Sequence, residues 1–444
     1  MKRFLQNLHA ALELTPDCKS LIIAYSGGVD SHVLLHVCSQ LAESRPLLNI
    51  ESVYIDHGLH RDSDQWRLHC ESISKQLSIC FKSIKVDARD VHRDGPEQAA
   101  RKARYGAFEK IVNQDTVLFT AQHQDDQSET LMLQLLRGCG VDGLAAMPKI
   151  NAFSKGHLVR PFLELDKESI RAYADYYKLS WIEDPSNIEL DYNRNYLRHN
   201  VIPIIKERWP AFAKTTARTA GHCAEASEVL DKHFAQYIDT HEPRILDIGS
   251  LVSKDEASQR AIYRYWLKCN DVTMPSSKVL HEFINSVVQA TDDKVPILRL
   301  NRAEVRRHQQ CLYLLNTLQA IPDKEIINWK GDKCDLPHSL GDLLLTSTGS
   351  EGISKDIWAA SVITVKFRQG GEKLKIDGRE GTKRVKKLLN EHAIPVWVRQ
   401  RIPLIYINDQ LAAVAGYWID ASFIAKPNQQ AYQIEWRQPD FLIN

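Results

Sequence analysis

Ser26-Gly27-Gly28-Val29-Asp30-Ser31 lies between the apolar run Leu21–Tyr25 and an amphipathic stretch that continues from Ser31. Two adjacent glycines let backbone amides curve closely around an anion, the serines add hydroxyl donors, and a helix that starts here directs its positive end at the same point. The segment lacks the lysine of Gly-x-x-x-x-Gly-Lys-Ser/Thr loops, which reaches the terminal phosphates. The sequence therefore predicts a phosphate-binding loop that favours pyrophosphate release, with a plain strand-to-helix turn as the alternative.

Around this loop, β-rich runs alternate with helical patterns as far as about residue 130. The expected strands are Leu21–Tyr25, Ile50–Ile55, Cys80–Val86 and Thr116–Ala121. The expected helices are Ser31–Leu41, Ser63–Leu77 and Glu97–Val112. This alternation is typical of a parallel sheet whose crossover helices cover its faces. We therefore expect a doubly wound α/β domain.

The chain has 444 residues, more than one hydrophobic core usually organises. After Trp209-Pro210 the pattern changes to long helical segments with few strand signals before Ile297, and β-like runs resume at Ala360–Phe367, Ile402–Ile407 and Leu411–Ile419. We expect an α/β domain over residues 1–215, a helical middle domain over 216–322 and a small α/β domain over 345–444.

Composition excludes several classes of protein. Hydrophobic residues make up 43% of the chain and charged residues 25%, which is ordinary for a globular protein. The nine cysteines include no Cys-x-x-Cys pair, so neither a disulfide framework nor a zinc or iron–sulfur site is indicated. No signal peptide or long apolar run is evident, and we expect a cytoplasmic protein without a membrane segment. The formal net charge of +1 argues neither for nor against a nucleic acid partner.

The segment Ser26–Ser31 resembles the PP-loop of the N-type ATP pyrophosphatases, whose members bind ATP, hold pyrophosphate in this loop and adenylate an oxygen of their substrate. In that family Asp30 falls on a catalytic acid, whereas residue chemistry alone also allows an acid that complements the helix dipole. Other motifs narrow the resemblance. They are Asp56-His57-Gly58-Leu59, Glu97–Arg101 with Arg104-Tyr105, Ala121–Thr130, Leu136-Arg137-Gly138, Arg160-Pro161, and Trp181–Asn187 with Arg194-Asn195 and Arg198.

This series, in this order, resembles the tRNA(Ile)-lysidine synthetase family over the first ~200 residues. The resemblance implies ATP and Mg²⁺ as cofactors and two substrates, free L-lysine and an isoleucine tRNA with a CAU anticodon. It implies that the C2 oxygen of the wobble cytidine is adenylated and then replaced by the ε-amine of lysine, which converts AUG decoding to AUA decoding.

The chemistry assigns roles to residue types. Negative charge must be screened at the α-phosphate, and Arg101, Arg104 and Arg194 are the candidates. The lysine ammonium calls for carboxylates, and Asp126 and Glu129 are spaced to share one helix face. By resemblance, Asp30, Asp126, Glu129 and Arg194 are catalytic positions. The expected nucleotide site comprises Ser26, Gly27, Gly28, Val29, Asp30, Ser31, Asp56, His57 and His123, and no metal ligands can be assigned.

Each candidate has an ordinary structural alternative. Asp125 and Asp126 also suit a helix start, and Arg101 and Arg104 also suit a solvated helix surface. His57 and His123 also suit polar strand ends, although ligands bind at the carboxyl ends of parallel strands. Gln122 departs from the family, which more often has histidine there.

The segment from Lys366 to Arg401 is strongly basic, with eleven basic residues against four acidic ones, a local charge of +7. The basic residues are Lys366, Arg368, Lys373, Lys375, Arg379, Lys383, Arg384, Lys386, Lys387, Arg399 and Arg401; the acidic residues are Glu372, Asp377, Glu380 and Glu391. Such density offers phosphate contacts, with Gly370-Gly371 allowing close backbone approach and Trp397 available for stacking. A solvated basic helix face is the alternative.

The pattern from Arg368 to Ile405 resembles the C-terminal domain of the same family, which favours tRNA binding, and the middle domain of that family also contacts tRNA. Two rival functions remain open here. One is a 2-thiocytidine synthetase, which the missing Cys-x-x-Cys pair argues against. The other is a tRNA-binding protein with an inactive nucleotide site. The oligomeric state is open, with a homodimer as one option.

Overall fold

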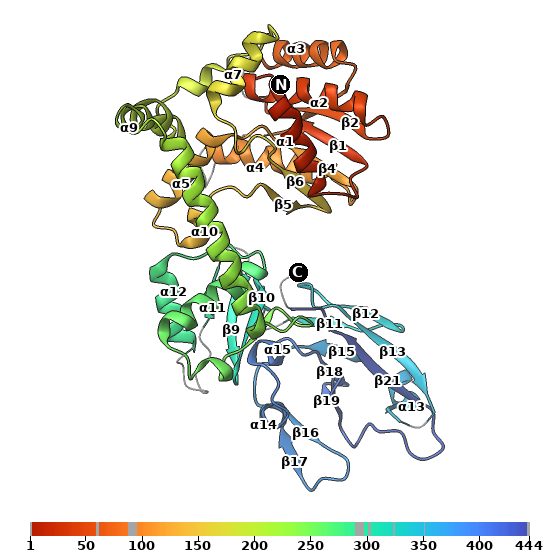
Figure 1. Ribbon diagram of the computed structural model, residues 1–444. Helices are drawn as coiled ribbons and strands as arrows, with labels where there is room; N and C mark the ends of the chain where they lie inside the picture. The colour runs from red at the N-terminus through yellow and green to blue at the C-terminus, as the bar shows by residue number, and fades with distance from the viewer. Residues whose placement is uncertain are drawn as a thin grey trace. The chain divides into compact units, whose positions relative to one another are not determined.

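The computed structural model describes residues 2–58, 62–87, 96–288, 297–300, 303–322, 325–349 and 351–441. Leu59, part of the Asp56–Leu59 motif, lies outside the described residues. The chain forms two compact units, Met1–Leu230 and Asp231–Asn444. Figure 1 shows the elements of each unit. The domain boundaries expected from the sequence at 215, 322 and 345 stay predictions.

The first unit is built on a six-stranded sheet in the order β3-β2-β1-β4-β6-β5. Its strands are β1 Ser20–Ala24, β2 Asn49–Asp56, β3 Cys80–Lys85, β4 Thr116–Phe119, β5 Ile150–Phe153 and β6 Gly156–Val159. The first four pair in parallel, β6 joins β4 in parallel, and β5 runs antiparallel to β6. The parallel α/β fold and its four expected strands are confirmed, and an antiparallel edge strand is added.

Helices cover both faces of this sheet (Figure 1), because side chains of one strand alternate between faces. In β1, Leu21 and Ile23 enter a core with helices α1, α2, α3 and α7, while Ile22 enters a second core with helix α4. The helices up to this point are α1 Lys2–Glu13, α2 Val29–Ser44, α3 Ser63–Gln76, α4 Pro96–Glu109, α5 Gln124–Leu136, α6 Val141–Leu144 and α7 Lys167–Tyr176. The three expected helices of the sequence are confirmed.

A run of helices follows the sheet and leads out of the first unit. It consists of α8 Asn193–Tyr196, the π-helical turn Leu197–Val201, α9 Ile202–Arg208 and the long α10 Phe212–Phe234. The hydroxyls of Ser128 in α5 and Thr216 in α10 lie 2.6 Å apart, and Ser227 of α10 bonds to Asp142 of α6. Helix α10 is therefore fixed to α5 and α6 within the first unit.

The second unit begins with a mixed α and β core. Helices α11 Glu256–Cys269 and α12 Ser277–Phe283 pack on an antiparallel sheet in the order β7-β10-β9-β8. Its strands are β7 Ile245–Asp247, β8 Ile297–Arg299, β9 Ala303–His308 and β10 Cys311–Asn316. The expected long helices are present, but the middle segment also holds this sheet. Two of its strands span only three residues, too short to show an alternating pattern.

A second core of this unit holds the C-terminal strands in three sheets, β11-β15-β18-β19-β20, β12-β13-β21-β14 and β16-β17. The strands are β11 Ile326–Asn328, β12 Lys333–Asp335, β13 Asp342–Thr348, β14 Ile353–Ser354, β15 Ile363–Lys366, β16 Lys373–Lys375, β17 Thr382–Arg384, β18 Leu404–Ile407, β19 Gln410–Val414, β20 Trp418–Ile419 and β21 Ala431–Arg437. The helices are α13 Lys355–Ala359, α14 Val385–Glu391 and α15 Val396–Arg399.

The three β-like runs expected in this region are confirmed as β15, β18 and β19–β20. Strands β11, β12 and β13 were not expected, because polar and glycine-rich spacers surround them. Strand β13 pairs along its whole length with β21, so a partner about ninety residues away in the sequence supplies its hydrogen bonds. No helix in the described part of the chain is long and apolar enough to cross a membrane.

Candidate active site

The phosphate loop predicted from the sequence connects β1 to α2. The Ser31 hydroxyl accepts from the Ser26 amide at 3.2 Å and donates to the Gly28 carbonyl at 2.9 Å, which bends the loop back on itself. Gly27 has φ +83°, a conformation that other residues rarely adopt. Within the described ranges no side chain caps α2 at Gly28, so the first-turn amides keep their donors for a ligand. The loop therefore has the local geometry of an anion site.

A distant segment, Trp181–Asp184, packs on this loop. The Ile182 amide donates to the Gly27 carbonyl at 2.9 Å, and a Cβ on Gly27 would lie 2.6 Å from the Ile182 side chain. Asp184 caps the following 3₁₀ turn by accepting from the Ser186 amide at 2.9 Å. Position 27 therefore requires glycine both for its φ and for the close approach of Ile182.

Helix α5 begins after strand β4 with a reciprocal cap. His123 Nδ1 accepts from the Asp125 amide at 3.2 Å, while Asp126 Oδ2 accepts from the His123 amide at 3.0 Å. Asp126 is thus a helix-start acid, one of its two sequence interpretations. Its other oxygen, Oδ1, lies 3.3 Å from the Arg198 guanidinium and 3.7 Å from that of Arg194. One carboxylate therefore fixes the helix start and faces two cations.

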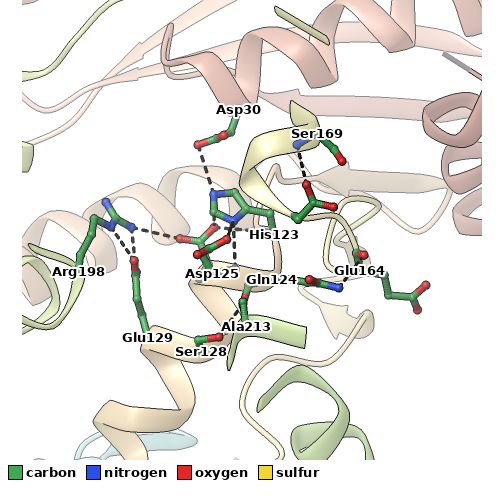
Figure 2. Close-up of polar contacts among 12 residues, drawn as sticks. Asp30, His123, Gln124, Asp125, Ser128, Glu129, Glu164, Ser169, Arg198 and Ala213 are labelled. Carbon is green, nitrogen blue, oxygen red and sulfur yellow. Dashed lines mark hydrogen bonds and ion pairs between the residues drawn. The ribbon is translucent and has the colours of Figure 1, made fainter. Parts of the chain in front are cut away.

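The centre of the site is a group that we call the charge cluster. Its members are Asp30, His123, Asp125, Asp126, Glu129, Arg194, Arg198 and Lys206. Figure 2 shows Arg198 directed at Glu129 and His123 directed at Asp30. The structure therefore brings His123, Asp126 and Glu129 of one sequence motif together with Asp30 and Arg194, which come from two others.

Glu129 is the most buried acid of the cluster, with 2% of its side chain exposed. Its Oε2 accepts from Arg194 at 2.7 Å, and its Oε1 accepts from Arg198 at 2.6 Å. Arg198 also donates to Oε2 at 2.8 Å. Charge-assisted bonds of this kind are strong and fix the planes of the guanidinium groups. Glu129 therefore holds both arginines in place.

His123 lies among carboxylates. Its Nε2 is 3.7 Å from Asp30 Oδ2 and 3.5 Å from Asp126 Oδ2. Burial, the largest single influence, acts to lower the pKa of His123, but the charges of Asp126, Asp30 and Asp125 outweigh it and raise the pKa to about 9. Nδ1 accepts the capping bond in the neutral ring, and Asp125 Oδ2 lies 3.8 Å from it, at ion-pair distance, when the ring is protonated.

The four acids of the cluster are balanced by its cations. Burial alone would raise the pKa of Asp126, but His123, Arg194 and Arg198 lower it below its usual value, so this carboxyl stays ionised. Lys206 of α9 pairs with Asp125 Oδ1. Two buried oxygens, Asp30 Oδ1 and Asp125 Oδ2, have no hydrogen-bond partner in the described part of the chain. A buried polar atom without a partner is costly, which marks this as a place for a ligand.

Asp56, His57 and Arg104 form a second group where strand β2 ends. The Asp56 carboxylate accepts from the Gly58 amide at 2.9 Å, and Arg104 approaches His57 Nε2 at 3.4 Å. Burial, with a further contribution from Arg104, lowers the pKa of His57 to about 4, so the ring is neutral near pH 7. Its other nitrogen, Nδ1, is buried and without a partner among the described residues.

Arg101 lies outside the charge cluster but close enough to Arg104 that its positive charge, after burial, helps to lower the pKa of the Arg104 guanidinium. The Arg101 side chain is exposed, and its guanidinium lies over the Tyr105 ring, 4.9 Å from the centroid. Within the described ranges, neither Arg101 nor Arg104 forms a hydrogen bond or ion pair with the charge cluster. Gln122 accepts a bond from the Thr120 hydroxyl and is likewise outside the cluster.

Three cluster members have no role in the sequence-based prediction: Arg198, Asp125 and Lys206. Arg198 follows Arg194 by four residues, a spacing that places both on one helix face and that could have identified it. For Asp125 the sequence indicates only a helix-start position. Lys206 lies in no sequence motif. Its pairing with Asp125 could not be predicted from local spacing, because the two residues are 81 positions apart.

In the second unit, part of the basic segment lies in the open. Exposed or half-exposed cations come from β16, β17 and α14 and form what we call the basic surface. They are Lys373, Lys375, Lys383, Arg384, Lys386 and Lys387. None of the six takes part in an ion pair among the described residues. Such cations are available to phosphates.

Other residues of the basic segment are structural. Trp397, expected to stack on RNA, is only 2% exposed, and its ring packs against Tyr313 and His308. Arg401 is buried and donates to the carbonyls of Trp397 and Gln319. The expectation that Trp397 is available for stacking was wrong, because its ring fills part of a hydrophobic core. A tryptophan suits such a core as well as it suits an RNA-binding surface.

Comparison with known proteins agrees along the chain. Three family models match: "PP-loop domain" over residues 1–205, "TilS substrate binding domain" over 246–313 and "TilS substrate C-terminal domain" over 363–436. A tRNA(Ile)-lysidine synthase of Coxiella burnetii is 40% identical over 419 residues, covering 94% of this chain and 93% of that protein. One of Legionella pneumophila (strain Paris) is 38% identical over 426 residues, covering 94% and 95%.

Among solved structures, the U34-tRNA thiolase NcsA of Methanococcus maripaludis superposes with a TM-score of 0.43 at 14% identity, covering 50% of this chain and 79% of that one. The first unit, with its parallel sheet, its loop and the first family match, is that of a PP-loop enzyme that uses ATP. The two curated relatives extend over nearly the whole length. The chain belongs to the tRNA(Ile)-lysidine synthase family, a family of ATP-dependent ligases that modify tRNA.

Proposed function

We propose that this chain adenylates the C2 oxygen of the wobble cytidine in an isoleucine tRNA with a CAU anticodon and then replaces that oxygen with the ε-amine of free L-lysine. The products are lysidine, AMP and pyrophosphate, and the modified tRNA reads AUA instead of AUG. We place this reaction in the cytoplasm. The observation that carries the proposal is that an anion-binding loop and the charge cluster occur together in a chain that matches its relatives over nearly its whole length.

In the first step the cytidine O2 attacks the α-phosphorus of ATP and pyrophosphate leaves. The amides of the Gly27–Ser31 turn and the hydroxyls of Ser26 and Ser31 are suited to hold the departing pyrophosphate. Arg194 and Arg198 are suited to stabilise the negative charge that develops at the α-phosphate, because Glu129 has already oriented them. Arg101 and Arg104 stay in the proposal as outer phosphate contacts.

Mg²⁺ fits the site through Asp30 and Asp125, whose free oxygens are buried without partners in the described part of the structure. Among the described residues no group of three or more ligands could hold a metal by itself, which suits an ion that takes one or two carboxylates and completes its shell with phosphates and water. When bound, Mg²⁺ would neutralise charge on the phosphates.

In the second step the lysine ε-amine attacks C2 and AMP leaves with the former O2. We assign Asp126 to attract the incoming ammonium, since its low pKa keeps it charged. A carboxylate of low pKa is a weak base, so the proton of the ammonium passes to solvent, while His123, whose pKa of about 9 keeps it protonated near pH 7, stays paired with Asp126. Glu129 acts through the two arginines, both of its oxygens being engaged.

The test uses the purified chain with ATP, Mg²⁺, radiolabelled lysine and an isoleucine tRNA transcript with a CAU anticodon. We expect label in the acid-precipitated RNA, and its loss when the wobble cytidine is replaced. tRNA-dependent AMP release without label would keep the adenylation step and move the nucleophile to something other than lysine. The absence of both label and AMP release would overturn the proposal.

A further inference from the structure

A groove of about 490 Å³ lies where α9 ends and α10 begins, and the charge cluster makes no use of it. Its walls include Ile205, Arg208, Trp209, Phe212 and Thr215. Trp209 as a residue is 63% exposed, which leaves a large apolar side chain accessible at a fixed corner between two helices. The corner is fixed because the Trp209 amide donates to the Ile205 carbonyl at 2.8 Å and the Phe212 amide donates to the Trp209 carbonyl at 2.9 Å.

Arg208 lines the groove, and two further cations, Lys214 and Arg218, follow on the first turns of α10. Arg208, Lys214 and Arg218 are exposed, and within the described ranges none of them forms an ion pair. Lys214 and Arg218 stand four residues apart and so share one side of α10. The acid Glu207 is also exposed next to Arg208. Three cations against one acid beside an exposed indole favour a polyanion with flat apolar groups over a hydrophobic protein surface.

The groove adjoins the charge cluster within the first unit. Lys206, one turn before the corner, pairs with Asp125, and Thr216, one turn after it, contacts Ser128. Both partners belong to α5, the helix that carries Asp126 and Glu129. The groove therefore lies between two helical segments that are both anchored to the helix carrying the acids of the charge cluster.

We propose that this groove binds one unpaired nucleobase of the anticodon loop, stacked on Trp209, with the neighbouring phosphates on Arg208, Lys214 and Arg218. The inference rests on the proposed function and names a binding site for its RNA substrate. Stacking of a base on an aromatic ring contributes to affinity without reading sequence. The groove holds a nucleotide flanking the wobble cytidine and so presents the cytidine to the cluster.

The test places 2-aminopurine at either position that flanks the wobble cytidine in the tRNA transcript and titrates it with the full chain. We expect fluorescence quenching at one of the two positions, because stacking quenches this base. In Trp209→Ala the quenching is lost, and the Kd for tRNA rises about 10-fold. In Trp209→Phe, which keeps a stacking ring, the Kd stays within about 3-fold of wild type.

Tyr176→Ala is the matched control, because Tyr176 is an aromatic residue of the same unit that is 79% exposed on α7. We expect it to titrate as wild type does. Steady-state kinetics add a second measurement: Trp209→Ala raises the KM for tRNA about 10-fold and leaves the KM for lysine and for ATP unchanged. Circular dichroism confirms that each variant is folded.

Several results would overturn the inference. They are a Trp209→Ala variant that binds and quenches as wild type, an equal loss in Tyr176→Ala, and a change of oligomeric state in Trp209→Ala with tRNA affinity unaltered. The last would make the groove a contact between copies of the chain. If the wild-type chain modifies the tRNA and Trp209→Ala binds and modifies it equally well, only this inference is rejected. If the wild-type chain neither binds the tRNA nor incorporates lysine, the proposed function is rejected as well.

Discussion

The charge cluster and the basic surface are both made of charged side chains, yet their construction is opposite. In the cluster, apart from the closer Lys206–Asp125 pair, acids and bases are paired at 2.6 to 3.8 Å, and the side chain of Glu129 is 2% exposed. On the basic surface the cations are exposed or half-exposed and form no ion pair among the described residues of the unit. Buried charges depend on the exact presence of each partner, while exposed charges act as a sum that salt screens. Substitutions should therefore have sharp effects in the first region and graded effects in the second.

The largest effect is expected for Glu129→Gln. A neutral amide cannot balance two guanidinium groups, so Arg194 and Arg198 lose the orientation on which the transition-state contact depends. We expect kcat/KM for tRNA to fall about 10³-fold and stability to fall by about 3 kcal/mol, measured by lysine incorporation and by denaturant unfolding. Glu164→Gln is the control, because its exposed pair with Lys149 contributes less than about 1 kcal/mol. Near-normal turnover in Glu129→Gln would contradict the role assigned to Arg194 and Arg198.

A second prediction separates the core of the C-terminal region from its surface. Trp397→Ala removes a buried ring that packs on Tyr313 and His308 and should cost about 3 to 5 kcal/mol of unfolding free energy. Tyr417→Ala, which removes a more exposed ring, should cost far less. If Trp397→Ala weakened tRNA binding and left stability unchanged, the ring would belong to the RNA surface after all.

A third prediction concerns pH and the group at the end of β2. The pKa of folded His57, about 4, lies below the ordinary value of about 6.5, so the unfolded chain binds more protons between these values. The stability contributed by the neutral ring is complete above pH ~6.5 and is lost as pH falls to about 4, by up to ~3 kcal/mol. His57→Gln should flatten this part of the stability profile. Arg104→Gln should raise the pKa of His57 only partway, because burial is the larger cause.

The smallest effect is expected on the basic surface. Replacing Lys386 and Lys387 together by alanine removes two phosphate contacts, so the Kd for tRNA should rise about 5- to 10-fold and the salt dependence of binding should decrease by about 1 to 2 units of slope. Lys333→Ala serves as control, because this lysine is paired with Asp335 and Asp342. An unchanged salt slope would show that the surface does not touch RNA.

The sequence predicted the parts of the fold that depend on local pattern. Strand β1, the loop from Ser26 to Ser31 and helix α2 were found because their signals are contiguous. Strand β7 was missed because three residues cannot show a period. In the site, Asp126 and Glu129 share one helix and could be paired from their spacing.

The other contacts of the site could not be predicted from the sequence, because they join residues that are distant in the chain. Lys206 reaches Asp125, and Ile182 reaches Gly27, across large distances in the chain. Trp397 was misplaced because the sequence shows the type of a side chain but not the side of the sheet or helix to which it turns. The chemical type of each site residue was therefore easier to predict than whether its side chain is buried or exposed.

The balance of four acids against three basic side chains and His123 in the charge cluster has an evolutionary consequence. No member can change its charge alone without leaving a neighbour unpaired, so single substitutions should be eliminated by selection, while combined exchanges that restore the balance can persist. Double substitutions here should be strongly non-additive. Natural variation at Asp30, Asp125, Asp126, Glu129, Arg194, Arg198 and Lys206 should therefore occur in linked pairs, whereas each lysine of the basic surface is free to drift on its own.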